Sequence, residues 1–272
     1  MSVDASFGVL RLHAQPTLRR YPKNFPMSLE RAQALIIRGY DFSETSRIAV
    51  MWTREFGKVG AMAKGGRRLK SAFESSLDLL NVCDIVLIRK ASGTLDLLTE
   101  ARVCERFPRL RHNLAAWYAG QYVAELLGDW TQDHDPHPVL FDEAIETLRD
   151  LDGRAAGPGP RLARFELVLL RELGYGPALE HCAACNAVVA ERSTAFSPAR
   201  GGVLCPQCQP LERDRIPLGR DALEWMLRLR QDNVAWRELA DMDVRKTIRR
   251  ILGDYVTYVR GRRPRLLPYL GS

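Results

Sequence analysis

Four cysteines in two closely spaced pairs constrain this chain more than any other feature of its sequence. Cys182 and Cys185 enclose two residues, and after a gap of 19 residues Cys205 and Cys208 enclose two more. This spacing is typical of a four-cysteine zinc ribbon or knuckle. It allows two tight turns to direct four thiolates at one ion, at roughly 2.3 Å from the metal.

Four thiolates complete a tetrahedral shell and leave no position open for water or substrate. We therefore predict one structural Zn²⁺ per chain, held by Cys182, Cys185, Cys205 and Cys208. The turn residues Gly201 and Gly202 lie between the two pairs. A pair of disulfides is the alternative, which suits secreted proteins.

Nothing in the sequence indicates secretion or a membrane span. The N-terminus has no sustained apolar segment, and no apolar run reaches the roughly 18 residues of a spanning helix. A reducing cytoplasm is the consistent compartment, and there paired cysteines indicate metal before disulfides. We take His181, which adjoins Cys182, as a neighbour of the metal site and not as a ligand.

Five β-rich segments follow one another between residue 33 and about residue 105. They are 34–42, 46–56, 58–65, 79–91 and 94–106. In the second, Ile48, Val50 and Trp52 alternate with the residues between them, as in a strand with one buried face. Five strands in this length favour an OB-fold β-barrel, with an SH3-like barrel as the alternative. Cys83 and Cys104 are expected in the barrel core.

Helical spacing replaces strand alternation after about residue 106. Apolar residues recur every three or four positions in 113–130, 141–151, 161–173 and 219–260. We therefore expect an α+β multi-domain chain: an OB-fold barrel at 28–105 and a mostly helical domain at 106–272, with the zinc module at 178–212. Residues 1–27 are predicted to be a disordered tail or to precede a true start at Met27.

Positive charge is concentrated in two stretches of a chain whose net charge is +7. The first stretch, in the expected barrel, consists of Arg47, Lys58, Lys64, Arg67, Arg68 and Lys70. Gly65 and Gly66 would let the backbone approach a phosphate closely. We predict that this cluster binds nucleic acid; the alternative is a solvated rim.

The second stretch, near the C-terminus, contains Arg245, Lys246, Arg249 and Arg250, with further arginines at 260, 262, 263 and 265. Like charges spaced i, i+4 cost a helix a few tenths of a kcal/mol unless an anion lies between them. A partner-binding face is therefore one interpretation, and a solvated helix face is the other.

The sequence contains none of the common catalytic motifs. P-loop, HExxH, GxSxG and GxGxxG patterns are missing, and the carboxylates form no paired constellation. We therefore expect no enzymatic activity.

Three segments in order resemble the RecO family of recombination mediators. The first resembles the family's barrel, with Arg47, Thr53, Gly57 and the Ala-Lys-Gly-x-Arg segment at 63–67. The second, 165–185, resembles the helix that runs into the family's zinc module, and 196–208 resembles the second half of that module. The resemblance covers about residues 33–260. It departs from the family pattern at 1–27 and at Asn186, where the family often has Gly.

The resemblance implies an OB barrel, a helical domain and a zinc module. It also implies binding to single- and double-stranded DNA, annealing of complementary strands, and contact with RecR and single-strand-binding protein. The family helps RecA load onto DNA, which places it at the nucleoid. The acidic C-terminal tail of single-strand-binding protein is our expected partner for the cluster at Arg245, Lys246, Arg249 and Arg250. The rival hypotheses are a zinc-ribbon protein that binds RNA or the ribosome, and a hydrolase of nucleic acids.

Overall fold

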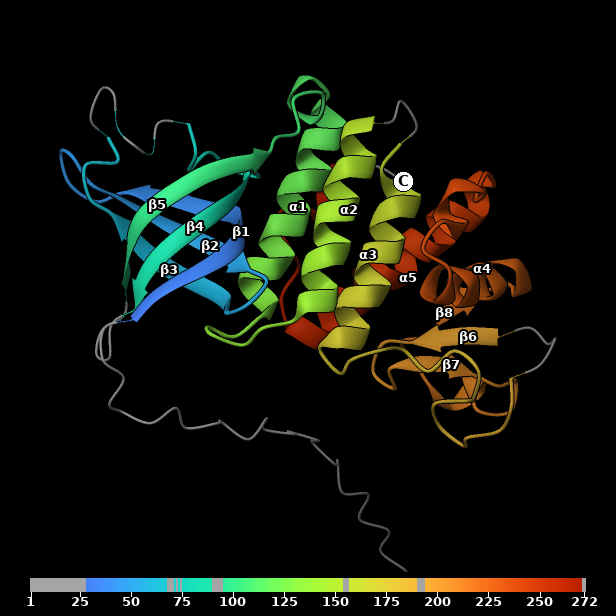
Figure 1. Cartoon of the computed structure of the whole chain (residues 1–272). Coiled ribbons are helices and arrows are strands. Elements are labelled where there is room, and N and C mark those ends of the chain that lie inside the picture. Colours follow the sequence, from blue (N-terminus) through green and yellow to red (C-terminus); the bar gives the residue numbers. More distant parts are fainter. Residues whose placement is uncertain are drawn as a thin grey trace, which may run out of the picture.

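A computed structural model describes residues 28–67, 71, 73, 75–89, 95–153, 157–189 and 194–270. Our predictions for residues 1–27, Arg68 and Lys70 lie outside these residues. Figure 1 shows a β-barrel at one end, a row of helices beside it, and a small sheet under the far end of that row. The fold class is therefore α+β, as predicted.

The barrel consists of five strands: β1 (Ser28–Asp41), β2 (Arg47–Thr53), β3 (Gly57–Ala63), β4 (Val82–Arg89) and β5 (Asp96–Glu105). The strand order is β1-β2-β3-β5-β4, and pairing of β1 with β4 closes the barrel. Only the β3–β5 pair is parallel among these neighbours. This arrangement fits a five-stranded OB barrel, which confirms the predicted N-terminal fold.

Small side chains fill the barrel because its interior is narrow. The interior holds five alanines together with larger residues such as Met51 and Ile85. Cys83 is buried among them, as predicted, but Cys104 is exposed. Side chains alternate along β5, and the partly buried Ala101 and Val103 take the inward positions, so Cys104 points outward.

One outer face of the barrel is also buried. Leu35, Ile37 and Trp52 belong to the same apolar cluster as the residues between the helices. Trp52 is fully buried, while its neighbour Met51 lies inside the barrel. The second strand is therefore covered on both faces at its end, because the helical domain packs against the outside of the barrel.

The helical domain contains α1 (Leu114–Trp130), α2 (Pro138–Gly153), α3 (Gly159–Glu172), α4 (Arg220–Gln231) and α5 (Met242–Arg260). Asn113 caps α1 by accepting a hydrogen bond from the Ala116 amide, and Asp241 caps α5 in the same way. The small sheet has the order β7-β6-β8, formed by β7 (Gly202–Leu204), β6 (Thr194–Ser197) and β8 (Ile216–Leu218).

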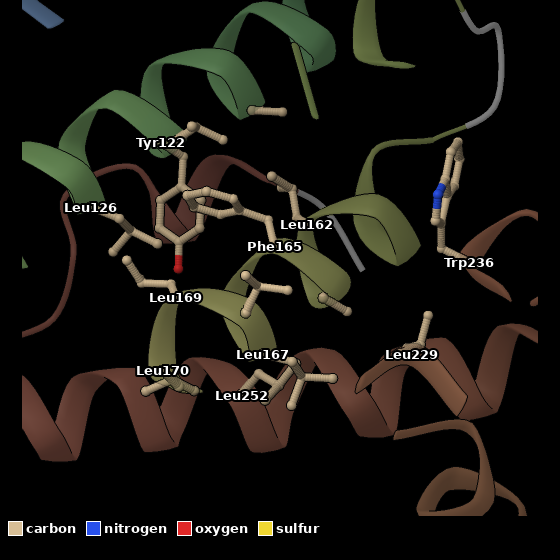
Figure 2. Close-up of a cluster of buried hydrophobic side chains, with 14 of the residues drawn as sticks. Tyr122, Leu126, Leu162, Phe165, Leu167, Leu169, Leu170, Leu229, Trp236 and Leu252 are labelled. Carbon is tan, nitrogen blue, oxygen red and sulfur yellow. The ribbon is translucent and has the colours of Figure 1, made fainter. Parts of the chain in front are cut away.

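Helix α3 runs through the centre of the domain and is buried on all sides. The sequence predicts a single apolar face for it, but every residue from Pro160 to Leu170 is buried. Phe165 packs near Tyr122 of α1, and Leu252 of α5 lies on the other side of the helix (Figure 2). Helices on several sides therefore cover the positions that a surface helix would expose.

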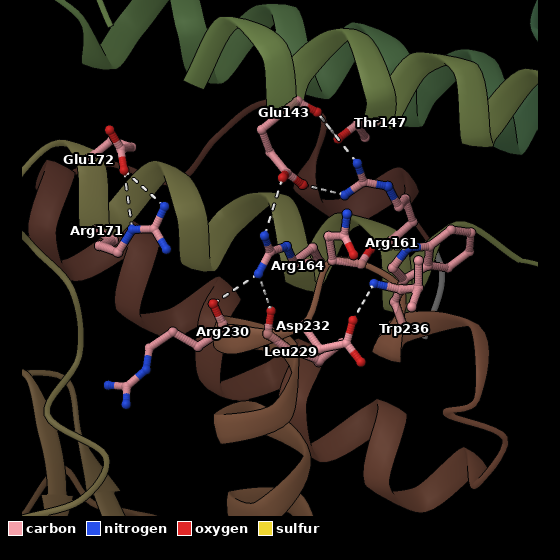
Figure 3. Close-up of polar contacts among 12 residues, drawn as sticks. Glu143, Thr147, Arg161, Arg164, Arg171, Glu172, Leu229, Arg230, Asp232 and Trp236 are labelled. Carbon is pink, nitrogen blue, oxygen red and sulfur yellow. Dashed lines mark hydrogen bonds and ion pairs between the residues drawn. The ribbon is translucent and has the colours of Figure 1, made fainter. Parts of the chain in front are cut away.

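Three charged residues of α3, Arg161, Arg164 and Glu166, are buried with partners. Arg161 donates to Glu143 of α2 at 2.5 Å, and Arg164 donates to the carbonyl oxygens of Leu229 and Arg230 at 2.7 and 2.9 Å. Figure 3 shows these contacts converging between α2, α3 and the end of α4. Burial of a charge costs much less when it is paired and hydrogen-bonded, so these contacts hold the helices in one arrangement.

Candidate metal centre and basic surfaces

The four cysteines come together at the edge of the small sheet. Their sulfur atoms all lie within 4.8 Å of one another. The Cys185 and Cys205 sulfurs are 3.7 Å apart. Two thiolates on a tetrahedral zinc ion, with bonds of roughly 2.3 Å, are separated by about 3.8 Å. The donor set and its spacing therefore fit one metal ion, and the predicted ligands lie at one site.

Backbone turns hold the sulfur atoms in place. Asn186 has a φ of 61° and donates to the Cys182 carbonyl at 2.8 Å, so Asn adopts the left-handed conformation that this turn requires. Between the cysteine pairs, Gly201 has a φ of 69°, which fits the predicted turn. A Cβ on Gly202 would lie 2.5 Å from the Ala178 carbonyl oxygen, so only glycine fits there.

The electrostatics of Cys182 favour a thiolate. Burial works to raise the pKa of its thiol, but the backbone N–H groups of Cys205, Cys185 and Ala184 outweigh burial and lower the pKa to about 6. The Cys205 amide lies 3.4 Å from the Cys182 sulfur. A thiolate is the form that binds metal, so this turn prepares a ligand. His181 instead pairs through its backbone with Val188.

Three residues of the first basic cluster meet at one end of the barrel. Arg47 begins β2, and Lys64 and Arg67 belong to the turn that follows β3. Arg67 donates to the Ser43 carbonyl at 2.7 Å, and its backbone amide donates to Thr45. The turn after β3 is therefore fastened to the β1–β2 turn, and Lys64 and Arg67 stay exposed.

Lys58 is placed differently from the rest of that cluster. Its ammonium group donates to the carbonyl oxygens of Gly128 and Thr131 at 2.9 Å each, and lies 3.3 Å from a carboxylate oxygen of Asp133. These carbonyls lie at the C-terminal end of α1, where a cation is favoured. Lys58 thus connects the barrel to the helical domain, and its ammonium group already contacts three oxygen atoms of that domain.

Two exposed aromatic residues lie beside the cluster and were not predicted as binding residues from the sequence. Tyr40 and Phe42 are 47% and 58% exposed at the β1–β2 turn. The aromatics considered from the sequence are instead packed: Trp52 and Phe73 are buried, and Phe56 is partly buried. Two aromatics within seven residues of Arg47 were a signal in the sequence, but their exposure depended on the fold.

The second basic cluster divides into two pairs on α5. Arg245 and Arg249 face inward: Arg245 donates to the Leu239 carbonyl, and Arg249 donates to Glu166 at 2.7 Å. Burial lowers the pKa of Arg249, but the charges and hydrogen bonds of Glu166 and Tyr122 together outweigh burial and raise it. Lys246 and Arg250 face outward and are 55% and 67% exposed.

A cleft of about 430 Å³ lies beside the outward pair. Its lining includes Lys246, Arg249 and Arg250 of α5, together with Arg263, Leu267 and Pro268 of the C-terminal segment. We call it the α5 cleft. One guanidinium nitrogen of Arg249 is buried and has no hydrogen-bond partner in the described part of the chain. The α5 cleft therefore combines four cations and one carboxylate, that of Asp254, with an apolar wall.

Among the residues that the structure describes, no helix has the length and apolar character needed to cross a membrane.

Comparisons with known proteins identify the family. The model of the recombination protein O N-terminal domain matches residues 27–107, and that of its C-terminal domain matches residues 111–268. A DNA repair protein RecO of Rhodopirellula baltica is 42% identical over 193 residues, which are 70% of this chain and 71% of the relative. RecO of Roseiflexus sp. (strain RS-1) is 31% identical over 242 residues, or 88% of this chain and 84% of that protein. The chain therefore belongs to the RecO family of DNA repair proteins.

Proposed function

We propose that this RecO protein is a DNA-binding recombination mediator without catalytic activity. It binds single- and double-stranded DNA and anneals complementary strands. Together with RecR, it helps RecA load onto DNA that is coated with single-strand-binding protein. Membership of the family supports this role, and its place in the cell is then the nucleoid.

The observation that carries the proposal is the composition of the barrel end. Tyr40 and Phe42 are exposed beside the cations Arg47, Lys64 and Arg67. Oligonucleotides bind OB barrels at the β1–β2 loop, where cations contact the phosphates and aromatic rings stack on bases. Arg68 and Lys70 follow directly in the sequence, and we propose that they add to this surface.

We propose a structural role for the metal, which we take to be Zn²⁺. Four cysteine ligands leave no open position, so the ion would supply no Lewis-acid chemistry. Its binding would stabilise the segments around β6 and β7, which lie next to the helical core.

We propose that the α5 cleft binds the acidic C-terminal tail of single-strand-binding protein. Lys246, Arg250 and Arg263 would face the carboxylates, and Leu267 would contact an apolar side chain of the tail. Arg245 and Arg249 would contribute positive charge without direct contact to the tail, since they are hydrogen-bonded to Leu239 and Glu166 within the fold.

The test is an annealing assay on complementary strands coated with single-strand-binding protein. We expect the chain to accelerate duplex formation in stoichiometric amounts and without any nucleotide cofactor. Failure to accelerate annealing would contradict the proposal. Competition between matched DNA and RNA strands separates it from the RNA-binding alternative, which predicts preference for RNA. Shortening of the strands in the presence of divalent metal would indicate a hydrolase.

A further inference from the structure

A second cleft lies between the barrel and the helical domain. Its volume is about 470 Å³, and its lining comes from β1, β2, α1, the segment before β4 and the C-terminal segment. We call it the interdomain cleft. The segment 263–268 contributes to both clefts, with Arg265 and Leu266 here and Arg263, Leu267 and Pro268 at the α5 cleft.

Three arginines face the interdomain cleft: Arg38 and Arg47 come from the neighbouring strands β1 and β2, and Arg265 comes from the C-terminal segment. Their nearest carboxylate oxygens lie at 3.8, 3.9 and 3.9 Å. These distances exceed those of hydrogen-bonded ion pairs, which are about 2.7–2.9 Å. The Nε atom of Arg47 is buried and has no hydrogen-bond partner in the described residues.

Two carboxylates near these arginines, Glu125 in the cleft lining and Asp129 beside it, are already engaged by other donors. Glu125 accepts the backbone N–H groups of Arg265 and Leu266 at 2.7 and 3.0 Å. Asp129 accepts a hydrogen bond from Arg262. The three arginines that line the cleft therefore keep most of their capacity to bind an anion.

The cleft also has an apolar side. Ile37 and Leu77 are buried in its lining, and Leu79 and Leu266 are partly buried. Arginines beside an apolar surface match the two parts of a nucleotide, because the phosphate carries charge and the base is flat and weakly polar.

We infer that the interdomain cleft binds single-stranded DNA, with phosphates at Arg38, Arg47 and Arg265 and a base against the apolar side. The inference rests on the proposed function and extends its site. Arg38 lies two residues from Tyr40 and donates to the tyrosine hydroxyl at 3.2 Å. A strand stacked on Tyr40 and Phe42 would thus continue directly into the cleft. A duplex would not place a base in the cleft, because its bases are stacked inside the helix and its phosphates form the outer surface.

The main test removes two arginines that line this cleft and do not line the α5 cleft. The variant Arg38→Ala/Arg265→Ala is compared with Arg102→Ala/Arg213→Ala, which removes the same charge from exposed positions elsewhere. Binding of a fluorescently labelled single strand is measured by anisotropy over a range of salt concentrations. We expect affinity to fall about tenfold for each cleft arginine lost. The salt slope should fall by roughly 1.4, or 0.7 for each phosphate contact.

A second test adds a positive charge to the cleft. It predicts a gain of affinity, which a loss of protein stability cannot produce. Gln121 of α1 lines the cleft, and Gln231 is exposed at the end of α4. We expect Gln121→Lys to bind the single strand more tightly, and with a steeper salt slope, than Gln231→Lys. The acidic tail peptide is titrated into the same variants.

The outcomes separate this inference from the proposed function. If the unaltered chain binds no DNA, the proposed function is wrong. If it binds DNA but both cleft variants behave like their controls, only the inference is wrong. It is also overturned if Arg38→Ala/Arg265→Ala loses the tail peptide and keeps its affinity for DNA, because the cleft would then be a protein-binding site.

Discussion

Arg249 of α5 donates a hydrogen bond from Nη1 to Oε1 of Glu166 on α3, at 2.7 Å, and the Glu166 side chain is fully buried. Tyr122 of α1 donates to the same oxygen at 2.6 Å. Three helices therefore meet at one carboxylate. Arg249 lies in a basic stretch of the sequence, yet its main contact is an internal one.

This contact predicts a large cost for removing Arg249. Arg249→Ala would leave the Glu166 charge buried without a counterion, which typically costs about 3–5 kcal/mol. Urea denaturation should show this loss, while Arg250→Ala, at an exposed position, should change the unfolding free energy by less than about 0.5 kcal/mol. The double variant Glu166→Gln/Arg249→Met should be more stable than Arg249→Ala, because it leaves no unpaired charge. Similar stability of Arg249→Ala and Arg250→Ala would contradict the assignment of Arg249 as the counterion of the buried Glu166.

Replacing Lys58 should affect the stability of the fold, and replacing Lys64 should affect DNA binding. Lys58→Ala removes two hydrogen bonds to helix α1, and we expect the unfolding free energy to fall by roughly 1–3 kcal/mol with no change in the salt slope of DNA binding. Lys64→Ala should leave stability unchanged and reduce that slope by about 0.7. Thermal unfolding and salt-dependent anisotropy distinguish the two. A shallower slope for Lys58→Ala would place Lys58 on the DNA surface after all.

The exposed aromatics at the barrel end should contribute to DNA affinity without sequence preference. Tyr40→Ala and Phe42→Ala should each weaken single-strand binding by about 1–3 kcal/mol, the value of one stacked base. Trp225→Ala is the control, because α4 lies at the other end of the molecule from the barrel (Figure 1). Equal affinities of the three variants would show that bases do not stack at the β1–β2 turn.

Metal removal should destabilise the small sheet and its surroundings. Elemental analysis should find one zinc per chain, and Cys182→Ser should lower both the zinc content and the melting temperature, because metal-binding energy is folding energy for such a site. Cys104→Ser is the matched control, since this cysteine is exposed and lies outside the cluster. Full zinc content in Cys182→Ser would contradict the assignment of the four cysteines as the zinc ligands.

The outward pair on α5 should bind the acidic tail peptide. Lys246→Glu/Arg250→Glu should abolish peptide binding in calorimetry and leave affinity for naked DNA within a few-fold. The pair is chosen because reversal at Arg249 would act through the buried Glu166 and confound the measurement. A comparable loss of DNA affinity would mean that the α5 cleft and the barrel end form one DNA surface.

Local patterns in the sequence were sufficient for several features. The spacing of Cys182, Cys185, Cys205 and Cys208 predicted that the four sulfurs gather at one site, because two residues between cysteines allow one turn to present both sulfurs. Alternation and helical spacing located the strands and helices, since these periods follow from backbone geometry. The family motifs in order were enough to predict an OB barrel followed by helices.

Tertiary packing decided what each charged residue does. Lys58 and Arg249 stand in basic runs like their neighbours, but one meets the end of α1 and the other meets Glu166. Arg265 lies far from Arg38 and Arg47 in the sequence, yet all three line one cleft, because the C-terminal segment returns across α1. Sequence spacing determines which residues share a turn or a face. Contacts between elements depend on how those faces pack, and only the folded chain specifies that.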